Sequence, residues 1–554
     1  MSYDLLIKNG MIVDGTGRPG YRADLAISGG KILEIGKVKD QAAKTIDASD
    51  LIVGPGFIDP HTHYDGQICW DPLVTASSWH GVTSVVMGNC GVGLSPCKPE
   101  FREVATWDLV NVEAIPFEVL NQGLTWDWET FPQFMDAADR RGSAINLGLL
   151  APLTPFRHYV MGEESMERAA TPDETARIRA LIKEAVAAGA LGFSTTNAPQ
   201  HIGYKSRPLA CRLADQTELQ AYASTLKELG KGAIEIIINR RVDAITPEEC
   251  NLLDMLLTAS GRQVTWLVLR KFVHAPDAYR EMLRVADQVI KRGAHPQLAT
   301  MELIGEFSFR QPSLALALYP SWKPAFNATL EEQKALYGDR AFRAAFREET
   351  TRRPGLFTNI WNRVTVNFAQ NPAIRALEGQ TVEQVARARG QDPLDTFFDL
   401  PLEDNLETRY CSAMTEVPTE LLTDSRVLLG ESDGGAHVAD FCTAGYTSDL
   451  IGKWVRERQM LTLEQAIKRT TSEPADFFGL RDRGRLAPGF AADVVIFDYN
   501  RISCDARESV DDLPGGGRRF VVRSKGIEYT VVNGQVVYQS GTHTGALPGH
   551  VLRS

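Results

Sequence analysis

Apolar runs of strand length alternate with longer helical stretches through most of this 554-residue chain. This alternation predicts a parallel β-sheet with helical connections, because parallel strands need long crossovers. Eight runs are strand candidates: 58–63, 82–90, 144–150, 191–195, 233–239, 264–269, 297–303 and 427–430. We therefore expect an α/β fold in which residues 58–486 form a (β/α)8 TIM-like barrel.

The two ends of the chain differ from this middle part. Residues 1–57 and 487–554 contain short apolar runs separated by turns such as Asn9-Gly10, which predicts β-hairpins. We expect both ends to form one small composite β-sandwich. Residues 304–375 mix aromatic residues with charged helical stretches and fit no regular βα unit. They are either an insertion that caps the mouth of the barrel or a packed surface excursion.

The charge and composition of the chain limit its binding partners and its location. The net charge of −11 and the pI of about 5.5 argue against nucleic acid and anionic membrane surfaces as partners. The chain lacks an apolar run of about 20 residues and the pattern of a signal peptide. Its eight cysteines are scattered without the spacing of a disulfide framework. We expect a cytoplasmic protein that associates with copies of itself.

His61-Thr-His63 follows the first strand candidate. Side chains two residues apart on an extended strand point to the same side, so both imidazoles can reach one metal ion. A His-x-His pair is also common as an unliganded polar pair. Its place after a buried strand favours the metal site, because chemistry in α/β barrels lies at the carboxyl ends of strands.

Three further residues follow strand candidates. Cys90 ends the second and is either a thiolate ligand or a small buried apolar residue. Asp433 follows the eighth within Ser-Asp-Gly-Gly, which is also an ordinary turn sequence. His437 is either a ligand or partner in the same pocket, or a loop residue. Together with His61 and His63, these residues form the candidate site.

Two stretches carry a resemblance to a known family. Gly54-Pro-Gly-Phe-Ile-Asp-Pro-His61-Thr-His63 resembles the first metal motif of the amidohydrolase superfamily. Gly81-Val-Thr-Ser-Val-Val-Met-Gly-Asn-Cys90-Gly is similar to its N-acyl-D-amino-acid deacylase (D-aminoacylase) branch. The resemblance covers nearly the whole chain. It implies zinc ligation by His61, His63, Cys90 and Asp433, with Asp433 also acting as the catalytic general base.

The sequence departs from that branch where more ligands are expected. The branch places histidines at the ends of the fifth and sixth strands, where this chain has Asn239 and Arg270-Lys271. The fourth strand also offers no lysine that could be carboxylated to bridge two metals. We therefore expect one zinc ion per chain rather than two. The alternative is a degenerate barrel with weakened or lost catalysis.

Basic and polar residues at the strand ends suggest an anionic substrate. The candidates for binding it are Arg270, Lys271, Arg241, Asn239 and His437. A basic pair on a solvated loop is the alternative for Arg270 and Lys271. We expect a metal-dependent hydrolase that deacylates an N-acyl amino acid or a similar small amide. A cyclic-amide hydrolase of the hydantoinase or dihydroorotase type, and a catalytically silent subunit, are the rival interpretations.

Overall fold

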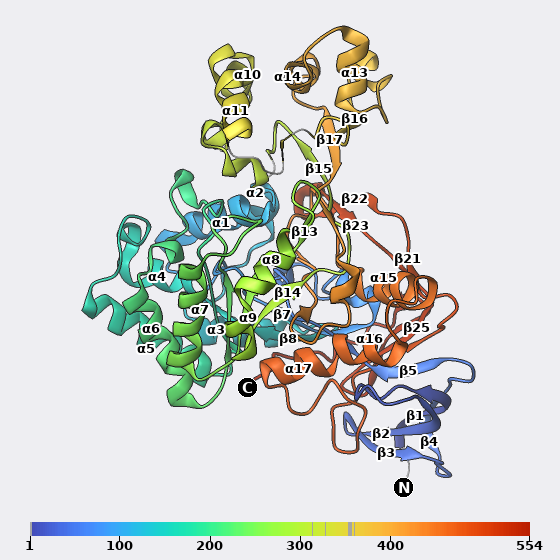
Figure 1. Cartoon of the computed structure of the whole chain (residues 1–554). Coiled ribbons are helices and arrows are strands. Elements are labelled where there is room, and N and C mark those ends of the chain that lie inside the picture. The colour runs from blue at the N-terminus through green and yellow to red at the C-terminus, as the bar shows by residue number, and fades with distance from the viewer. Residues whose placement is uncertain (1–2, 313, 327, 353–356, 359, 554) are drawn as a thin grey trace.

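The computed structural model describes residues 3–553, apart from 313, 327, 353–356 and 359. Figure 1 shows an α/β body, a β-sheet region that holds the N-terminus, and a lobe above the body. The lobe contains α10, α11, α13 and α14, and the chain enters and leaves it through β15 and β17. Within the described residues, no helix has both the length and the apolar character needed to cross a membrane.

Parallel strands form the centre of the body. One sheet has the order β6-β7-β8 and another has the order β19-β14-β12-β11-β10-β9, with every pairing parallel. Their bounds are β6 Phe57–Asp59, β7 Val82–Met87, β8 Asn146–Leu149, β9 Ala151–Pro152, β10 Gly192–Thr196, β11 Ala233–Ile237, β12 Val264–Leu267, β14 Ala294–Leu298 and β19 Leu428–Leu429. The predicted mixed α/β fold with parallel strands is confirmed.

The strand bounds differ from the predicted ranges by one or more residues throughout, and the first and seventh strands differ most. The first ends at Asp59 rather than at 63, because Pro60 has no N–H to donate to the ladder. The seventh is Ala294–Leu298 rather than 297–303. His295 and Pro296 obscured its start in the sequence, and residues 299–303 contain no glycine or proline to mark its end.

Helices follow these strands, and several of them begin at a capping box. Thr171, Asp215 and Thr246 each form a capping box at the start of a helix, which satisfies backbone donors that have no partner within the helix. The helices of the body are α1 Arg102–Glu113, α2 Phe117–Gly123, α3 Phe131–Arg141, α4 Leu153–Met161, α5 Pro172–Ala187, α6 Gln216–Leu229, α7 Pro247–Ser260, α8 Ala278–Val285, α9 Asp287–Lys291, α15 Tyr446–Asp449, α16 Leu463–Thr470 and α17 Ser472–Phe478.

A nine-stranded sheet combines strands from both ends of the chain. Its order is β27-β26-β25-β20-β5-β1-β2-β3, with β4 paired to β1. The strands are β1 Tyr3–Ile12, β2 Tyr21–Ser28, β3 Lys31–Gly36, β4 Ala42–Asp47, β5 Ile52–Pro55, β20 Val494–Phe497, β25 Ile527–Val532, β26 Gln535–Gln539 and β27 Thr542–His543. β20 joins the two halves because it pairs with β5 on one side and β25 on the other.

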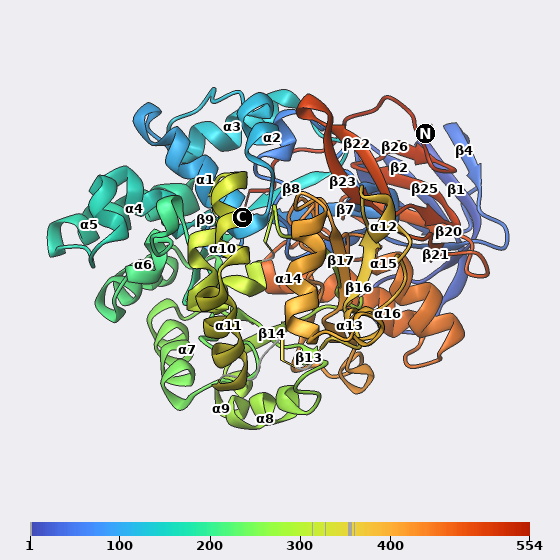
Figure 2. The ribbon, with the colours of Figure 1, turned by 90° about the horizontal axis from the view of Figure 1, so that it is seen from above.

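The lobe has its own apolar core, which we call the aromatic core. A three-stranded antiparallel sheet forms its base: β15 Ile304–Ser308, β16 Thr365–Phe368 and β17 Arg409–Ala413. Its helices are α10 Leu330–Gly338, α11 Arg340–Arg352, α12 Pro372–Arg375, α13 Val382–Arg389 and α14 Pro393–Glu403. Viewed from above, α10, α11 and α14 lie over the body (Figure 2).

Short paired strands surround the body near this lobe. β13 Lys271–Phe272 pairs with β18 Thr415–Glu416, and β22 Glu508–Leu513 pairs with β23 Gly517–Val521. β21 Ser503–Cys504 pairs with β24 Ser524–Lys525.

Candidate metal centre

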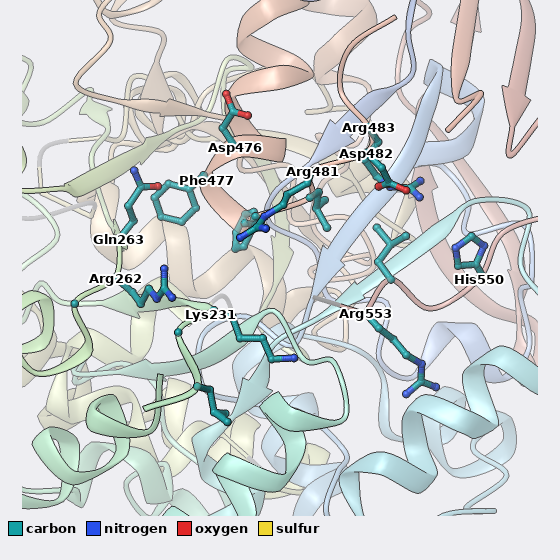
Figure 3. A pocket seen from close by; sticks show the side chains of 18 residues that line it. Lys231, Arg262, Gln263, Asp476, Phe477, Arg481, Asp482, Arg483, His550 and Arg553 are labelled. Atoms are coloured by element: carbon teal, nitrogen blue, oxygen red, sulfur yellow. The ribbon is translucent and has the colours of Figure 1, made fainter. Parts of the chain in front are cut away.

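Six of the predicted site residues line one cavity at the carboxyl ends of the parallel strands, and four of them are the predicted metal ligands. The cavity has a volume of about 170 Å³, and His61, His63, Cys90 and Asp433 form part of its wall. A larger cavity of about 820 Å³ lies at the opposite, amino-terminal ends, where Lys231, Arg262 and Arg481 surround it (Figure 3). That larger cavity contains none of the predicted ligands, so size does not identify the site.

The two histidines of the first motif converge as predicted. The Nε2 atoms of His61 and His63 lie 3.2 Å apart, and both side chains are buried. The backbone N–H of His63 donates to the carbonyl oxygen of Gly434, which ties this motif to the loop after β19. Gly435 is required there, because a Cβ would lie 2.7 Å from the carbonyl oxygen of His63.

Cys90 completes a three-residue cluster. Its Sγ lies 3.4 Å from Nε2 of His61 and 3.8 Å from Nε2 of His63. The residue has a φ of 58°, a left-handed conformation that is uncommon outside glycine and that needs support from its surroundings. Its backbone N–H donates to Oε2 of Glu235 at 2.7 Å, which provides such support.

The spacing of these atoms fits a tetrahedral metal ion. Zinc bound by nitrogen at about 2.0 Å and thiolate at about 2.3 Å separates nitrogen pairs by about 3.3 Å and nitrogen–sulfur pairs by about 3.6 Å. The observed separations are 3.2 Å, 3.4 Å and 3.8 Å. Within the described part of the chain, no other group of three or more His, Cys, Asp or Glu side chains lies as close together. The donor set therefore suits zinc.

Asp433 approaches the same point from the eighth strand. Its Oδ1 lies 3.5 Å from Nε2 of His61 and 3.9 Å from Nε2 of His63. The adjacent Ser432 holds the loop, because its hydroxyl donates to Asp59 at 2.5 Å and accepts from the N–H of Gly434 at 3.0 Å. Asp433 is thus placed by hydrogen bonds between the first and last strands.

Arg270 lies beside Asp433, with its guanidinium between two carboxylates. Its Nε lies 3.2 Å from Oε1 of Glu431, its Nη2 also bonds that oxygen, and Nη2 lies 3.5 Å from Oδ2 of Asp433. The side chains of Arg270 and Glu431 are 11% and 3% exposed. This ion pair is therefore held away from bulk water.

Buried acids dominate the electrostatics of the site. Burial raises the pKa of Glu113 and Glu235 well above the usual range, and it raises the pKa of Glu431 to about 7. Burial also acts to raise the pKa of Asp433, but His61 and Arg270 outweigh it, so that pKa is lowered. Such an excess of buried carboxyl groups is the setting in which a divalent cation is stabilised.

The two histidines of the site are held in the neutral form that can bind a metal ion. Burial lowers the pKa of His61 to about 4 and that of His63 well below its usual value. A neutral imidazole has a lone pair to offer a metal, whereas an imidazolium does not. The Nδ1 of His63 lies 3.4 Å from Oε1 of Glu113, a carboxylate placed to orient the ring.

The structure distributes the predicted substrate-binding residues differently from expectation. Arg270 and His437 line the central cavity, whereas Lys271, Asn239 and Arg241 are not part of its described wall. Each of these three has another partner. The Lys271 ammonium lies 2.6 Å from Glu416, Arg241 bonds Asp243, and the Asn239 amide bonds Ala244 and Val268.

Several polar residues of the wall were not predicted from the sequence: Glu113, Gln200, His201 and Glu431. Nor was Glu235, which accepts the backbone N–H of Cys90. Glu235 interrupts the apolar strand Ala233–Ile237, and an isolated carboxylate in a buried strand is a usable signal. Glu431 directly follows the eighth strand and offered a similar signal. His201 comes from the loop after β10 and had no sequence pattern to mark it.

Comparison with known proteins identifies the family of the chain. The model of the amidohydrolase family matches residues 44–538. D-aminoacylase from Alcaligenes xylosoxydans xylosoxydans is 26% identical over 553 residues, covering 99% of this chain and 97% of its own. N-acyl-D-glutamate deacylase from the same organism is 26% identical over 561 residues, covering 99% and 96%.

Solved structures show the same fold. The N-acyl-D-glutamate deacylase of Bordetella bronchiseptica, complexed with zinc and a phosphonate inhibitor, has a TM-score of 0.68 at 22% identity and full coverage of both chains. A D-aminoacylase structure has a TM-score of 0.67 at 22% identity, again with full coverage. The chain belongs to the amidohydrolase family. The predicted class, a hydrolase acting on carbon–nitrogen bonds other than peptide bonds, is thereby confirmed.

Proposed function

We propose that this protein removes the acyl group from N-acyl amino acids by metal-dependent hydrolysis of the amide bond. The observation that carries the proposal is the meeting of His61, His63, Cys90 and Asp433 at one point of the cavity. Relatives named D-aminoacylase, N-acyl-D-glutamate deacylase and N-acyl-D-aspartate deacylase, similar over 99% of this chain, support the substrate class.

These four residues would hold one zinc ion. When bound, the ion supplies positive charge that lowers the pKa of water and polarises a carbonyl group. Asp433 acts as the general base and general acid: it accepts a proton from the attacking water and passes it to the departing nitrogen. Its lowered pKa supports this role, because the carboxylate is ionised and ready to accept a proton at neutral pH.

The substrate is proposed to be a small anionic amide. A third cavity, of about 840 Å³, shares Val242 and Leu318 with the central cavity. It is lined by three basic residues, Arg240, Arg241 and Lys323. These cations would attract a carboxylate towards the entrance. The buried Gln200 and His201 line the inner wall and each has a side-chain atom with no described hydrogen-bond partner. They would hydrogen-bond the amide or carboxylate once it enters.

The architecture is proposed to be a closed barrel over 58–486 with a composite sandwich formed by 1–57 and 487–554. Two contacts support closure: the bridge between Thr62 and Gly434, and the N–H of Leu191 donating to the carbonyl oxygen of Leu149. The lobe is proposed to cap the site, since Glu306 and Leu318 line the cavity. Its core runs from Phe307 to Tyr410, which favours an end near residue 413 rather than 375.

The test is a substrate panel assayed with protein stripped of metal and then reloaded with zinc. N-acetylated D- and L-amino acids with apolar, acidic and basic side chains are compared with hydantoin and dihydroorotate. We expect amino acid release only after reloading and only from the N-acyl compounds. Ring opening of a cyclic amide at a higher rate would favour the rival hydrolase. No turnover by a zinc-loaded, folded protein would favour the silent subunit.

A further inference from the structure

The position of Arg270 is not that of a residue whose guanidinium is free to bind a substrate carboxylate. Its guanidinium is already bonded to Glu431 and lies against Asp433 inside the metal site. We propose that Arg270 is a built-in cation that takes the place of a second metal ion and holds Asp433 towards the first. This inference rests on the proposed metal site.

The two carboxylate oxygens of Asp433 face different positive groups. Oδ1 faces His61 and His63, where the ligand cluster lies. Oδ2 faces the Arg270 guanidinium at 3.5 Å. A second metal ion bound through Asp433 would need the Oδ2 side, and a permanent positive charge already lies there.

Burial makes this charge effective. Coulomb repulsion between two cations grows as the surroundings become less polar, and neither Arg270 nor Glu431 is screened by bulk water. Arginine does not lose its proton in proteins, so the repulsion persists at every accessible pH. Glu431 fixes the guanidinium in place, which prevents it from turning away to admit another ion.

Two other buried acids of the site have contacts of their own. Glu235 accepts the backbone N–H of Cys90. Glu113 lies beside His63 and His437, with closest separations of 3.4 Å and 3.9 Å. Glu431 differs from these two acids, because its partner Arg270 also contacts Oδ2 of Asp433.

A relative provides the contrast. A solved D-aminoacylase of the same fold is described by a binuclear metal centre with one-metal activation and second-metal attenuation. If Arg270 excludes the second ion, the present chain has no such attenuation. The single-ion state is then fixed by the protein rather than by the zinc concentration.

The experiment measures zinc binding to stripped protein by calorimetric titration, and metal retained after dialysis by elemental analysis. The variants are Arg270→His, which offers a ligand in place of the cation, and Arg270→Lys, which keeps the charge. Lys271→His is the matched control, because Lys271 pairs with Glu416 and is not part of the described cavity wall.

We expect about one zinc ion per chain for the parent, Arg270→Lys and Lys271→His, and about two for Arg270→His. Second-ion affinity should rise by about tenfold or more in Arg270→His. Should that variant fail to fold, Arg270→Gln removes the charge while keeping a donor towards Glu431, and it should also gain a second binding step.

A second ion bound by the parent, or a single ion bound by a folded Arg270→His or Arg270→Gln variant, would overturn the inference. The zinc count is independent of catalysis. A parent that binds one ion but hydrolyses no N-acyl amino acid would sink the proposed function and leave the role of Arg270 standing.

Discussion

The candidate metal centre and the aromatic core of the lobe differ in how their buried polar atoms are paired. At and around the candidate metal centre, five buried polar atoms lack described hydrogen-bond partners: His61 Nδ1, His63 Nδ1, Glu113 Oε1, Glu235 Oε1 and Glu431 Oε2. Among the described residues of the lobe, Trp322 Nε1 is the one such atom. Unpaired buried polar groups cost stability and are retained where function needs them.

The aromatic core shows what the chain achieves without that demand. The Phe309 ring lies 4.9 Å from both Tyr337 and Phe397, and Trp322 stacks on Phe398 at 5.8 Å between centroids. These are favourable geometries for aromatic pairs. From this contrast we expect that changes in the aromatic core affect stability more than chemistry, and that changes at the candidate metal centre do the reverse.

The largest effect is expected from Asp433→Asn. The amide keeps the size of the side chain but cannot accept a proton, so hydrolysis should fall by about 10²–10⁴-fold. The thermal midpoint should stay near that of the parent. Rates on the best substrate of the panel, with melting measured by circular dichroism, check this. Parental turnover by the variant would reduce Asp433 to a turn residue.

The next largest effect should come from Phe398→Ala in the aromatic core. Phe398 is fully buried, and loss of such a side chain costs about 3–5 kcal/mol. We expect calorimetry to show an early unfolding transition of the lobe while bound zinc is retained. Phe368→Ala, at a half-buried ring, is the milder control. Loss of zinc from the Phe398 variant would show that the two regions are coupled.

The third prediction concerns His80, a buried histidine whose two ring nitrogens both have hydrogen-bond partners. His80 bonds the Ser448 hydroxyl and the Val522 carbonyl, each at 2.9 Å, and burial lowers its pKa to about 4. The unfolded chain therefore takes up this proton first as the pH falls. His80 contributes about 3 kcal/mol of stability above pH ~6.5, which is lost as the pH falls towards 4.

The measurement for His80 is the free energy of unfolding against pH in parent and His80→Gln. Between pH ~6.5 and 4 the parent should lose more stability than the variant, because only the parent carries this titration. Parallel curves would mean that His80 is not held neutral.

The smallest effect on folding is expected for Cys90→Ala. Truncating one buried thiol should cost about 1 kcal/mol, by analogy with small core deletions. Zinc retention on dialysis should fall much more strongly, because a ligand is lost. Cys211→Ala, at another buried cysteine, is the control that should keep its metal. Equal zinc contents would return Cys90 to a packing role.

Strand periodicity carried most of what the sequence could predict. It located the parallel strands, and with them the strand-end positions of His61, His63, Cys90 and Asp433, because side chains at carboxyl ends of parallel strands meet at one edge. Pairing partners could not be predicted in the same way. Lys271 turns to Glu416 and Arg270 to Glu431 through contacts between segments 145 or more residues apart.

Other expectations stay predictions. The assignment of roles to the site residues awaits the variants above, and self-association and a cytoplasmic location await light scattering and fractionation. The place of His201 in the cavity wall could not be predicted from strand periodicity, because the backbone of a loop has no regular repeat.

The Ser432–Asp59 hydrogen bond joins residues that are 373 positions apart. During synthesis, the histidine motif leaves the ribosome long before the loop that completes it. Zinc arriving early would meet an open, incomplete set of donors and could be lost to competing thiols. We therefore expect stable loading of a metal ion only after the last strand has emerged, late in the synthesis of each chain.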